Sequence, residues 1–159
     1  MKCNLLTRWL MLVCIGITTS FFSCKKEEPT SDIYTLRQWK SVELTPASIV
    51  PAISGRTDHA VAVFYLMTDN KLHYYIYFDK PLNNSDTPGQ AVIYTGVAGT
   101  AGTVLINLNN SAFDANREVK GAVDLSASII SELNTKTVYL QISSAQQASG
   151  LVRGQLTSY

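Results

Sequence analysis

Side-chain polarity alternates with a two-residue period along several short stretches, and this period constrains the fold more than any other feature of the sequence. The clearest case is 72–78, where Leu72 and Ile76 fall on one face of an extended chain and His73 on the other. A run rich in β-branched and aromatic residues at 59–66 precedes it, and 68–71 between them consists of turn-forming residues. The two runs predict a β-hairpin.

The same pattern extends along the rest of the chain from residue 34. Further strands are predicted at 37–44, 90–94, 103–108, 119–125, 137–143 and 151–157. One segment differs: apolar residues at i, i+1 and i+4 in 126–133, with a serine suited to cap the start, predict one or two helical turns. About eight short strands with polar turns predict an all-β fold, a two-layer antiparallel β-sandwich with one short helical segment.

The first 23 residues have the features of a secretory signal peptide. Lys2 and Arg8 precede an apolar run at 9–17, which is shorter than the roughly 20 residues that a membrane-spanning helix needs. The end of this segment resembles a bacterial lipobox, with Ser23 before Cys24 and Phe21 where Leu is usual. We expect a lipoprotein signal peptide at 1–23. The alternative is an ordinary secretory signal cut elsewhere.

Cys24 is therefore the predicted lipidation site, and residues 24–33 are the lipidated cysteine and its tether to a domain at 34–159. The membrane is the expected partner, through acyl chains (palmitate) on Cys24. The Lys-Lys-Glu-Glu run at 25–28 resembles surface-export signals of Bacteroidota-type lipoproteins. We expect an outer-membrane, lipid-anchored protein on the cell surface, with a periplasm-facing position as the alternative.

Cysteine usage and charge exclude several function classes. The three cysteines are Cys3, Cys14 and Cys24, so the predicted domain has none and cannot form disulfides, thiolate zinc sites or iron–sulfur clusters. The chain carries 13 Lys and Arg against 12 Asp and Glu, a formal net charge of +1. Such a balance argues against a nucleic-acid partner, which normally requires a basic excess.

Three stretches resemble the CHRD domain, the module named after chordin. The first runs from 51–55 to the strand ending at Phe78; the second is 91–104, with glycines at 96, 99 and 102; the third is 138–144 followed by Gly150 to Leu156, which contains Arg-Gly-Gln at 153–155. The resemblance spans about residues 40–157. It implies an immunoglobulin-like or superoxide-dismutase-like sandwich and an interaction module without an established activity.

The chain departs from the family pattern at four positions. Val92 and Tyr94 stand where the family has paired histidines, Ser143 replaces a later histidine, and Leu151 replaces an acid. A metal held by those family histidines is therefore not expected here.

The remaining histidines do not form a predicted metal pair. With the hairpin turn centred on Asp69 and Asn70, His73 would lie opposite Leu66, which places His59 about 20 Å away at 3.3 Å per residue. We therefore predict no metal and no cofactor.

Catalytic residues are also not predicted. No Gly-x-Ser-x-Gly motif occurs, and the carboxylates considered as a pair fall in loops or at strand ends, where solvated charge is the ordinary explanation. These carboxylates are Glu43, Asp58, Asp79 and Asp124. A hydrolase with a site on the loops at one end of the sandwich stays open as the least favoured alternative, and clustering of Asp58, Asp79 and His59 in a deep pocket would favour it.

Tyrosines are the residues most suited to ligand contact, because each offers a rigid apolar ring with a hydroxyl group. The candidate binding residues are Tyr75, Tyr77, Tyr94, Tyr139 and Arg153, with Tyr65 as a further candidate. The open alternative is that half of the tyrosines pack the core and that Arg153 pairs across strands. We expect a non-catalytic binding or scaffolding module with an unknown protein or glycan partner. The second function considered is a glycan-binding accessory module.

Overall fold

The computed structural model describes residues 32–108 and 111–159. The predicted signal peptide, Cys24 and almost all of the tether lie outside these residues. Within the two described ranges, no helix has the length and apolar character required to cross a membrane.

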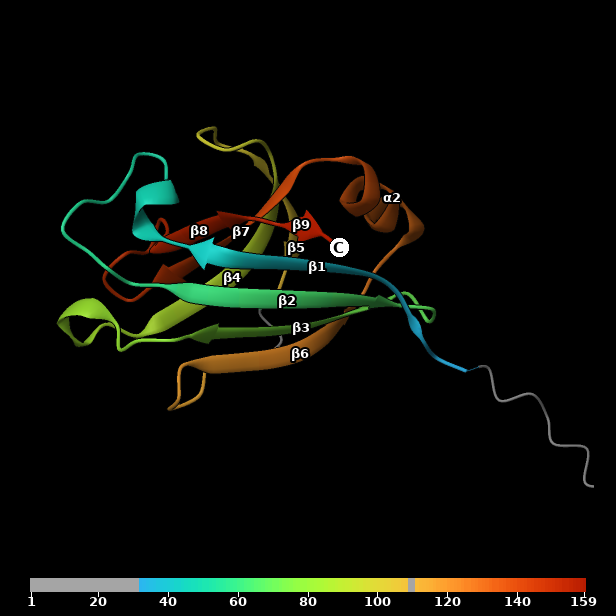
Figure 1. Ribbon diagram of the computed structural model, residues 1–159, viewed down its shortest axis with the longest axis horizontal. Coiled ribbons are helices and arrows are strands. Elements are labelled where there is room, and N and C mark those ends of the chain that lie inside the picture. Colours follow the sequence, from blue (N-terminus) through green and yellow to red (C-terminus); the bar gives the residue numbers. More distant parts are fainter. Residues whose placement is uncertain (1–31, 109–110) are drawn as a thin grey trace, which may run out of the picture. The chain divides into compact units, whose positions relative to one another are not determined.

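Two antiparallel sheets stack face to face, which confirms the predicted all-β sandwich (Figure 1). The five-stranded sheet has the order β6 (Glu118–Asp124), β3 (Lys71–Phe78), β2 (Ala60–Met67), β1 (Thr35–Leu44) and β9 (Thr157–Ser158). The four-stranded sheet has the order β5 (Thr103–Asn107), β4 (Pro88–Thr95), β7 (Val138–Ser144) and β8 (Val152–Gln155).

The β2–β3 hairpin forms as predicted, but its register differs by one residue. His73 pairs with Tyr65, and Leu66 pairs with Leu72, so the predicted pairing of His73 with Leu66 is wrong. The turn has three residues between the strands instead of two, with Asn70 in the left-handed conformation at φ 63°. Asparagine tolerates that conformation, and it closes three-residue hairpin loops of this kind.

The core lies between the sheets and follows from the alternation in the sequence. The inward residues of the hairpin are fully buried, whereas their neighbours on the outer face are partly or fully exposed. The inward set includes Ala60, Ala62, Phe64, Leu66, Leu72, Tyr74, Ile76 and Phe78. From the other sheet, the core receives Ala91, Ile93, Ile106, Val138, Leu140, Ile142 and Val152.

One edge of the sandwich is closed because the chain just after β1 bridges to β8 in the other sheet. Thr45 and Arg153 exchange two backbone hydrogen bonds of 3.1 Å just beyond the end of β1. The predicted single strand at 151–157 is in fact two: β8 pairs with β7, and β9 pairs with β1 in the opposite sheet. The chain changes sheets at Leu156, whose N–H donates to Val138 O at 2.9 Å.

Short helical elements cover the ends of the sheets. The predicted helical segment is α2 (Ala127–Thr135), and the Ser126 side chain accepts from Ile129 N as its N-cap. Leu133 anchors α2 in the core. Two 3-10 turns, η1 (Pro46–Ser48) and η2 (Asn83–Ser85), lie in the connections that follow β1 and β3.

Candidate functional site

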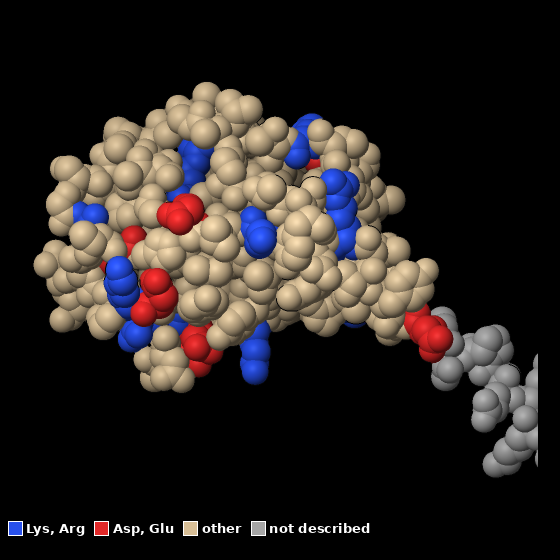
Figure 2. Space-filling model, in the orientation of Figure 1, with Lys and Arg blue, Asp and Glu red and all other residues tan. Residues whose placement is uncertain are grey.

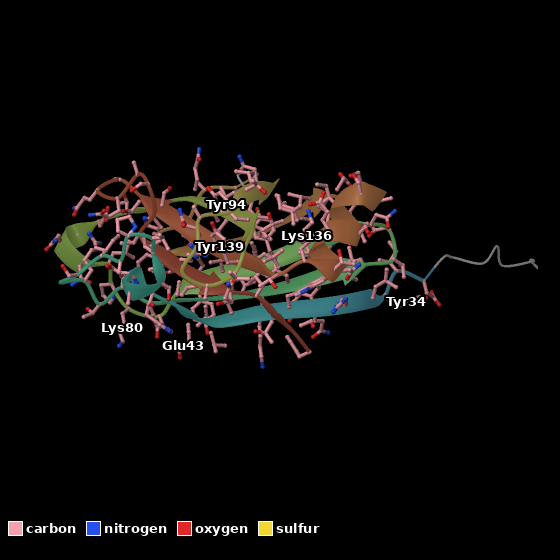
Figure 3. The ribbon with its side chains drawn as sticks, turned by 90° about the horizontal axis from the view of Figure 1, so that it is seen from above. Tyr34, Glu43, Lys80, Tyr94, Lys136 and Tyr139 are labelled. Atoms are coloured by element: carbon pink, nitrogen blue, oxygen red, sulfur yellow. The ribbon has the colours of Figure 1, made fainter. Side chains whose placement is uncertain are left out.

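The predicted binding residues fall on two different surfaces. Tyr75 and Tyr77 lie on the outer face of the five-stranded sheet, on β3. Tyr94, Tyr139 and Arg153 come from β4, β7 and β8 and lie on the outer side of the four-stranded sheet. Figure 3 shows Tyr94 and Tyr139 on the side of the molecule away from β1. The structure therefore does not bring the five residues together.

Tyr94, Tyr139 and Arg153 form a stacked column across three strands. The two tyrosine rings are parallel within 9°, with centroids 5.2 Å apart. The guanidinium carbon of Arg153 lies 3.5 Å from the centroid of the Tyr139 ring, the geometry of a cation–π contact. Tyr139 is 3% exposed and Arg153 is 2% exposed, although both project from the outer side of a sheet.

The glycine-rich loop between β4 and β5 covers this column. Arg153 Nη2 donates to Val97 O at 3.0 Å, and Gly102 N donates to the Tyr139 hydroxyl at 3.1 Å. The loop can lie this close because Gly102 has no side chain: a Cβ there would overlap Thr95 O. Tyr139 and Arg153 thus hold a loop in place and are buried beneath it.

A cavity of about 510 Å³ lies next to the column of Tyr94, Tyr139 and Arg153, near the end of β1. Its walls come from the end of β1, the η1 turn, the tip of the glycine-rich loop and the β8–β9 segment. Its charged lining residues are Lys40, Glu43 and Arg153.

The outer face of the five-stranded sheet carries the accessible aromatic residues. We call Tyr65, His73, Tyr75 and Tyr77 the tyrosine face. Tyr65 pairs with His73 across β2 and β3, and the rings of Tyr75 and Tyr77 lie 5.5 Å apart with a tilt of 32°. In Figure 2, where β1, β2 and β3 lie in front, most of the surface over these strands is neither acidic nor basic.

Two charged residues of β6 border the tyrosine face. Lys120 pairs with Tyr75, and Glu118 pairs with Tyr77. A hydrogen bond to the Glu118 carboxylate raises the pKa of Tyr75 above its ordinary value. A shallow hollow lies beside this border, lined by Tyr65, His73, Tyr75 and Lys120 among others. The face therefore combines apolar rings with hydrogen-bonding groups at one edge.

Of the three residues whose clustering would have favoured a hydrolase, His59 and Asp79 lie together but Asp58 does not join them. His59 Nε2 donates to Val42 O at 2.9 Å, and its Nδ1 lies 3.0 Å from Asp79 Oδ1 without the alignment of a hydrogen bond. Asp58 turns away from both, to Arg56. In the ranges 32–108 and 111–159, no group of three His, Cys, Asp or Glu residues is arranged to hold a metal ion.

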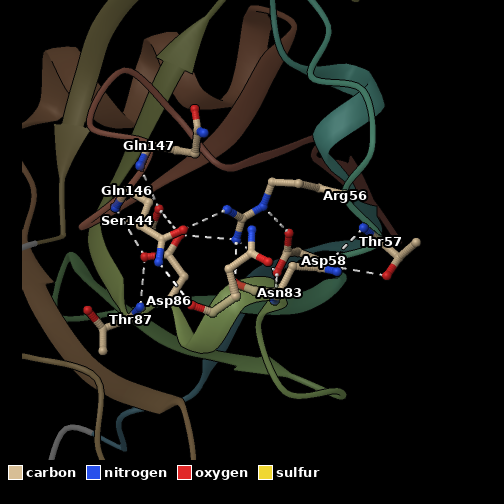
Figure 4. A network of polar contacts seen from close by, with 10 residues as sticks. Arg56, Thr57, Asp58, Asn83, Asp86, Thr87, Ser144, Gln146 and Gln147 are labelled. Carbon is tan, nitrogen blue, oxygen red and sulfur yellow. Dashed lines mark hydrogen bonds and ion pairs between the residues drawn. The ribbon is translucent and has the colours of Figure 1, made fainter.

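A buried polar network surrounds Arg56 (Figure 4). The guanidinium contacts Asp58 Oδ2 at 2.6 Å and Asp86 Oδ2 at 3.0 Å, and both carboxylate side chains are fully buried. Asp86 also accepts from the Ser144 hydroxyl at 2.6 Å and from Gln146 N at 3.1 Å. Burial alone would raise the pKa of Asp86, but these hydrogen bonds and the charge of Arg56 hold it below its ordinary value.

Sequence reasoning did not find this network. It considered Asp58 only as a solvated or catalytic acid and did not single out Arg56 or Asp86. The Arg-x-Asp spacing at 56–58 was the one available signal, because Asp86 and Ser144 come from distant segments of the chain. All polar groups of the network face one another, so its role is to join loops.

The two stacked antiparallel sheets define the class of protein as a β-sandwich domain. Its glycine-rich loop is held against one of them by Arg153 and Tyr139. The model of the CHRD domain family matches residues 40–156, and the chain therefore belongs to that family, as its motifs predicted. No curated protein matches the chain. No solved structure matches it either.

Proposed function

We propose that this protein is a lipid-anchored cell-envelope protein whose CHRD domain is a non-catalytic binding module, with the tyrosine face as its contact surface. The observation that carries the proposal is that Tyr65, Tyr75 and Tyr77 share the outer face of one sheet, where each is partly exposed. Aromatic side chains of this kind dominate the energetics of protein contact surfaces. Their backbones are fixed by ladders on both sides, so little further ordering is needed on binding.

The contacts of the acidic residues and His59 support binding over catalysis. Asp58 and Asp86 are both paired with Arg56, and His59 donates to a main-chain carbonyl. These groups stabilise loops. The side chains of the tyrosine face, by contrast, contribute little to holding the fold together. The proposed anchor is the lipid on Cys24, which would hold the module at the envelope.

The contact surface is tested by site-specific photocrosslinking in intact cells. A benzophenone amino acid replaces Tyr77 in one variant and Val104 in the control, because Val104 is 64% exposed but belongs to β5 in the other sheet. We expect discrete crosslinked adducts from position 77 and none from position 104. Equal labelling at both positions, or none at 77, contradicts the assignment of the tyrosine face.

A glycan is the second candidate ligand, and the Tyr75–Tyr77 pair favours it. Two neighbouring rings offer apolar plates for a sugar face, and the adjacent Glu118 carboxylate offers an acceptor for sugar hydroxyls. We expect the protein to bind a subset of glycans on an array and the double variant Tyr75→Ala with Tyr77→Ala to lose that binding. Absence of any signal from the wild-type protein would remove the glycan and leave a protein ligand.

A further inference from the structure

The chain enters the sandwich through three exposed apolar side chains. Ile33 is 59% exposed, Tyr34 is 61% exposed and Leu36 is 54% exposed. Their backbone is held in place: Tyr34 N donates to Thr68 Oγ1 at 3.2 Å, and Thr68 N donates to Tyr34 O at 3.0 Å. The side chains are therefore presented to solvent by the start of β1 and the two residues before it, where the backbone is held at Tyr34.

Local geometry explains why these side chains are not packed inward. The pairing of β1 with β2 shifts register between Thr35 and Arg37, so Leu36 occupies an irregularity in the ladder. The side chain of a residue at such a bulge points in a different direction from that of a residue in a regular ladder. The other large apolar residues that are exposed in the described ranges do not cluster within four successive positions; they are Val42, Val50, Val97, Val104 and Tyr159.

The position of the trio suits a lipid surface. Eight residues separate Cys24 from Ile33, and the nine extended steps between them span at most about 32 Å. In Figure 3, Tyr34 lies at the end of the sheets where the chain enters, and Glu43 and Lys80 lie at the other end. An anchor on Cys24 therefore restricts the Tyr34 end to the neighbourhood of the bilayer.

We propose that Ile33, Tyr34 and Leu36 insert into the interfacial region of the bilayer and dock this end of the domain onto it. The inference rests on the proposed lipid anchor. A tyrosine between aliphatic residues suits an interface, where its ring is apolar and its hydroxyl reaches water. Asp32 and Asp69 are exposed near the trio, so docking depends on apolar burial and not on anionic lipid.

Fluorescence quenching on vesicles tests the docking. The full lipidated chain is reconstituted into phosphatidylcholine vesicles that contain acyl-brominated lipid, with tryptophan introduced as Tyr34→Trp or, in the control, as Val50→Trp. Val50 is 44% exposed and follows η1 beyond the opposite end of β1. The native Trp39 is buried and gives a common background.

We expect Tyr34→Trp to lose most of its added fluorescence and Val50→Trp to keep it. Adding Ile33→Ser and Leu36→Ser to Tyr34→Trp should restore much of the emission. If the chain floats with the vesicles but the two tryptophans are quenched equally, the docking is wrong while the anchor stands. If the chain fails to float, the anchor is wrong, and the docking that rests on it is overturned as well.

Discussion

Gly102 illustrates how one residue fixes a family motif in space. Its N–H donates to the Tyr139 hydroxyl, and its missing side chain lets the loop pass over Thr95 O. The guanidinium of Arg153 stacks on the same tyrosine and binds the loop at Val97 O. The glycine repeat and the Arg-Gly-Gln motif are thus two halves of one contact, although they lie about 50 residues apart in the chain.

We predict that Gly102→Ala destabilises the fold by about 3 kcal/mol, because a backbone clash forces the loop off the column. Gly99→Ala is the matched control: its φ of +77° strains alanine, but no atom lies within 4 Å of the new Cβ. That variant should lose about 1 kcal/mol. Urea unfolding measures both losses of stability. Equal losses would mean that the close approach of the loop to Thr95 at Gly102 does not add to the destabilisation.

The sequence predicted the positions of these residues better than their roles. Alternation places Tyr139 and Arg153 on the outer side of a sheet, and the structure agrees. Alternation does not reveal that a loop returns over that side, because the loop is held by contacts between segments far apart in sequence. Tyr75 and Tyr77, on the outer side of β3, are only half-buried.

At the scale of elements, Arg56 joins connections that strand pairing leaves free. Its guanidinium reaches Asn83 O in η2 at 3.2 Å, Asp58 in its own loop and Asp86 before β4. Ser144, at the end of β7, completes the network through Asp86. Three chain segments are therefore coupled through buried, charge-assisted hydrogen bonds.

We predict that Asp86→Asn lowers the free energy of unfolding by about 3 kcal/mol at pH 7, since it removes one partner of a buried ion pair. Asp124→Asn is the control, because its carboxylate is 85% exposed in a surface pair with Lys71 and should change stability by less than about 0.5 kcal/mol. Both are measured by denaturant unfolding.

The effect of Asp86 should depend on pH in one direction. Its pKa is lower in the folded state than the value of about 3.9 for an unfolded chain. The carboxylate therefore contributes its full stability above that value, and the contribution disappears as the pH falls through the folded pKa. The difference in free energy of unfolding between wild type and Asp86→Asn should become smaller as the pH is lowered. A constant difference from pH 7 to pH 3 would contradict this account.

Strand positions were predictable because they depend on local alternation, and the helix at 127–135 was predictable from its cap and spacing. The division of the last predicted strand into β8 and β9 was not. Leu156 continues the apolar pattern, but its N–H bonds to Val138 while Thr157 pairs with Lys40 in the other sheet. Only the packing of both sheets decides where the chain crosses.

At the scale of the whole molecule, the proposed anchor and contact surface lie at different places along the same strands. Tyr34 precedes β1, whereas Tyr77 lies near the end of β3, which runs parallel to β1 because both are antiparallel to β2. With the Tyr34 end on the bilayer, the strands would point away from the membrane. The tyrosine face would then be open to the side.

We predict that Cys24→Ser abolishes metabolic labelling with palmitate and releases the protein from the membrane fraction, since several acyl chains are needed for stable anchoring. Cys14→Ser is the control, because Cys14 lies within the apolar run of the proposed signal peptide. Retained label in the Cys24 variant would contradict the anchor. Protease shaving of intact cells then reports orientation: release of the domain indicates surface display, and protection indicates the periplasmic side.

The placement of β1 also determines how the domain would respond to load. A pull between a lipid at the N-terminal end and a ligand held at Tyr77 runs along the strands, so the β1–β2 ladder is loaded in shear, with its hydrogen bonds sharing the force. The two bonds between Thr45 and Arg153 clamp the far end of the same strand to the second sheet. Such a strand would resist extraction as a unit, so the proposed link between lipid anchor and ligand would withstand force.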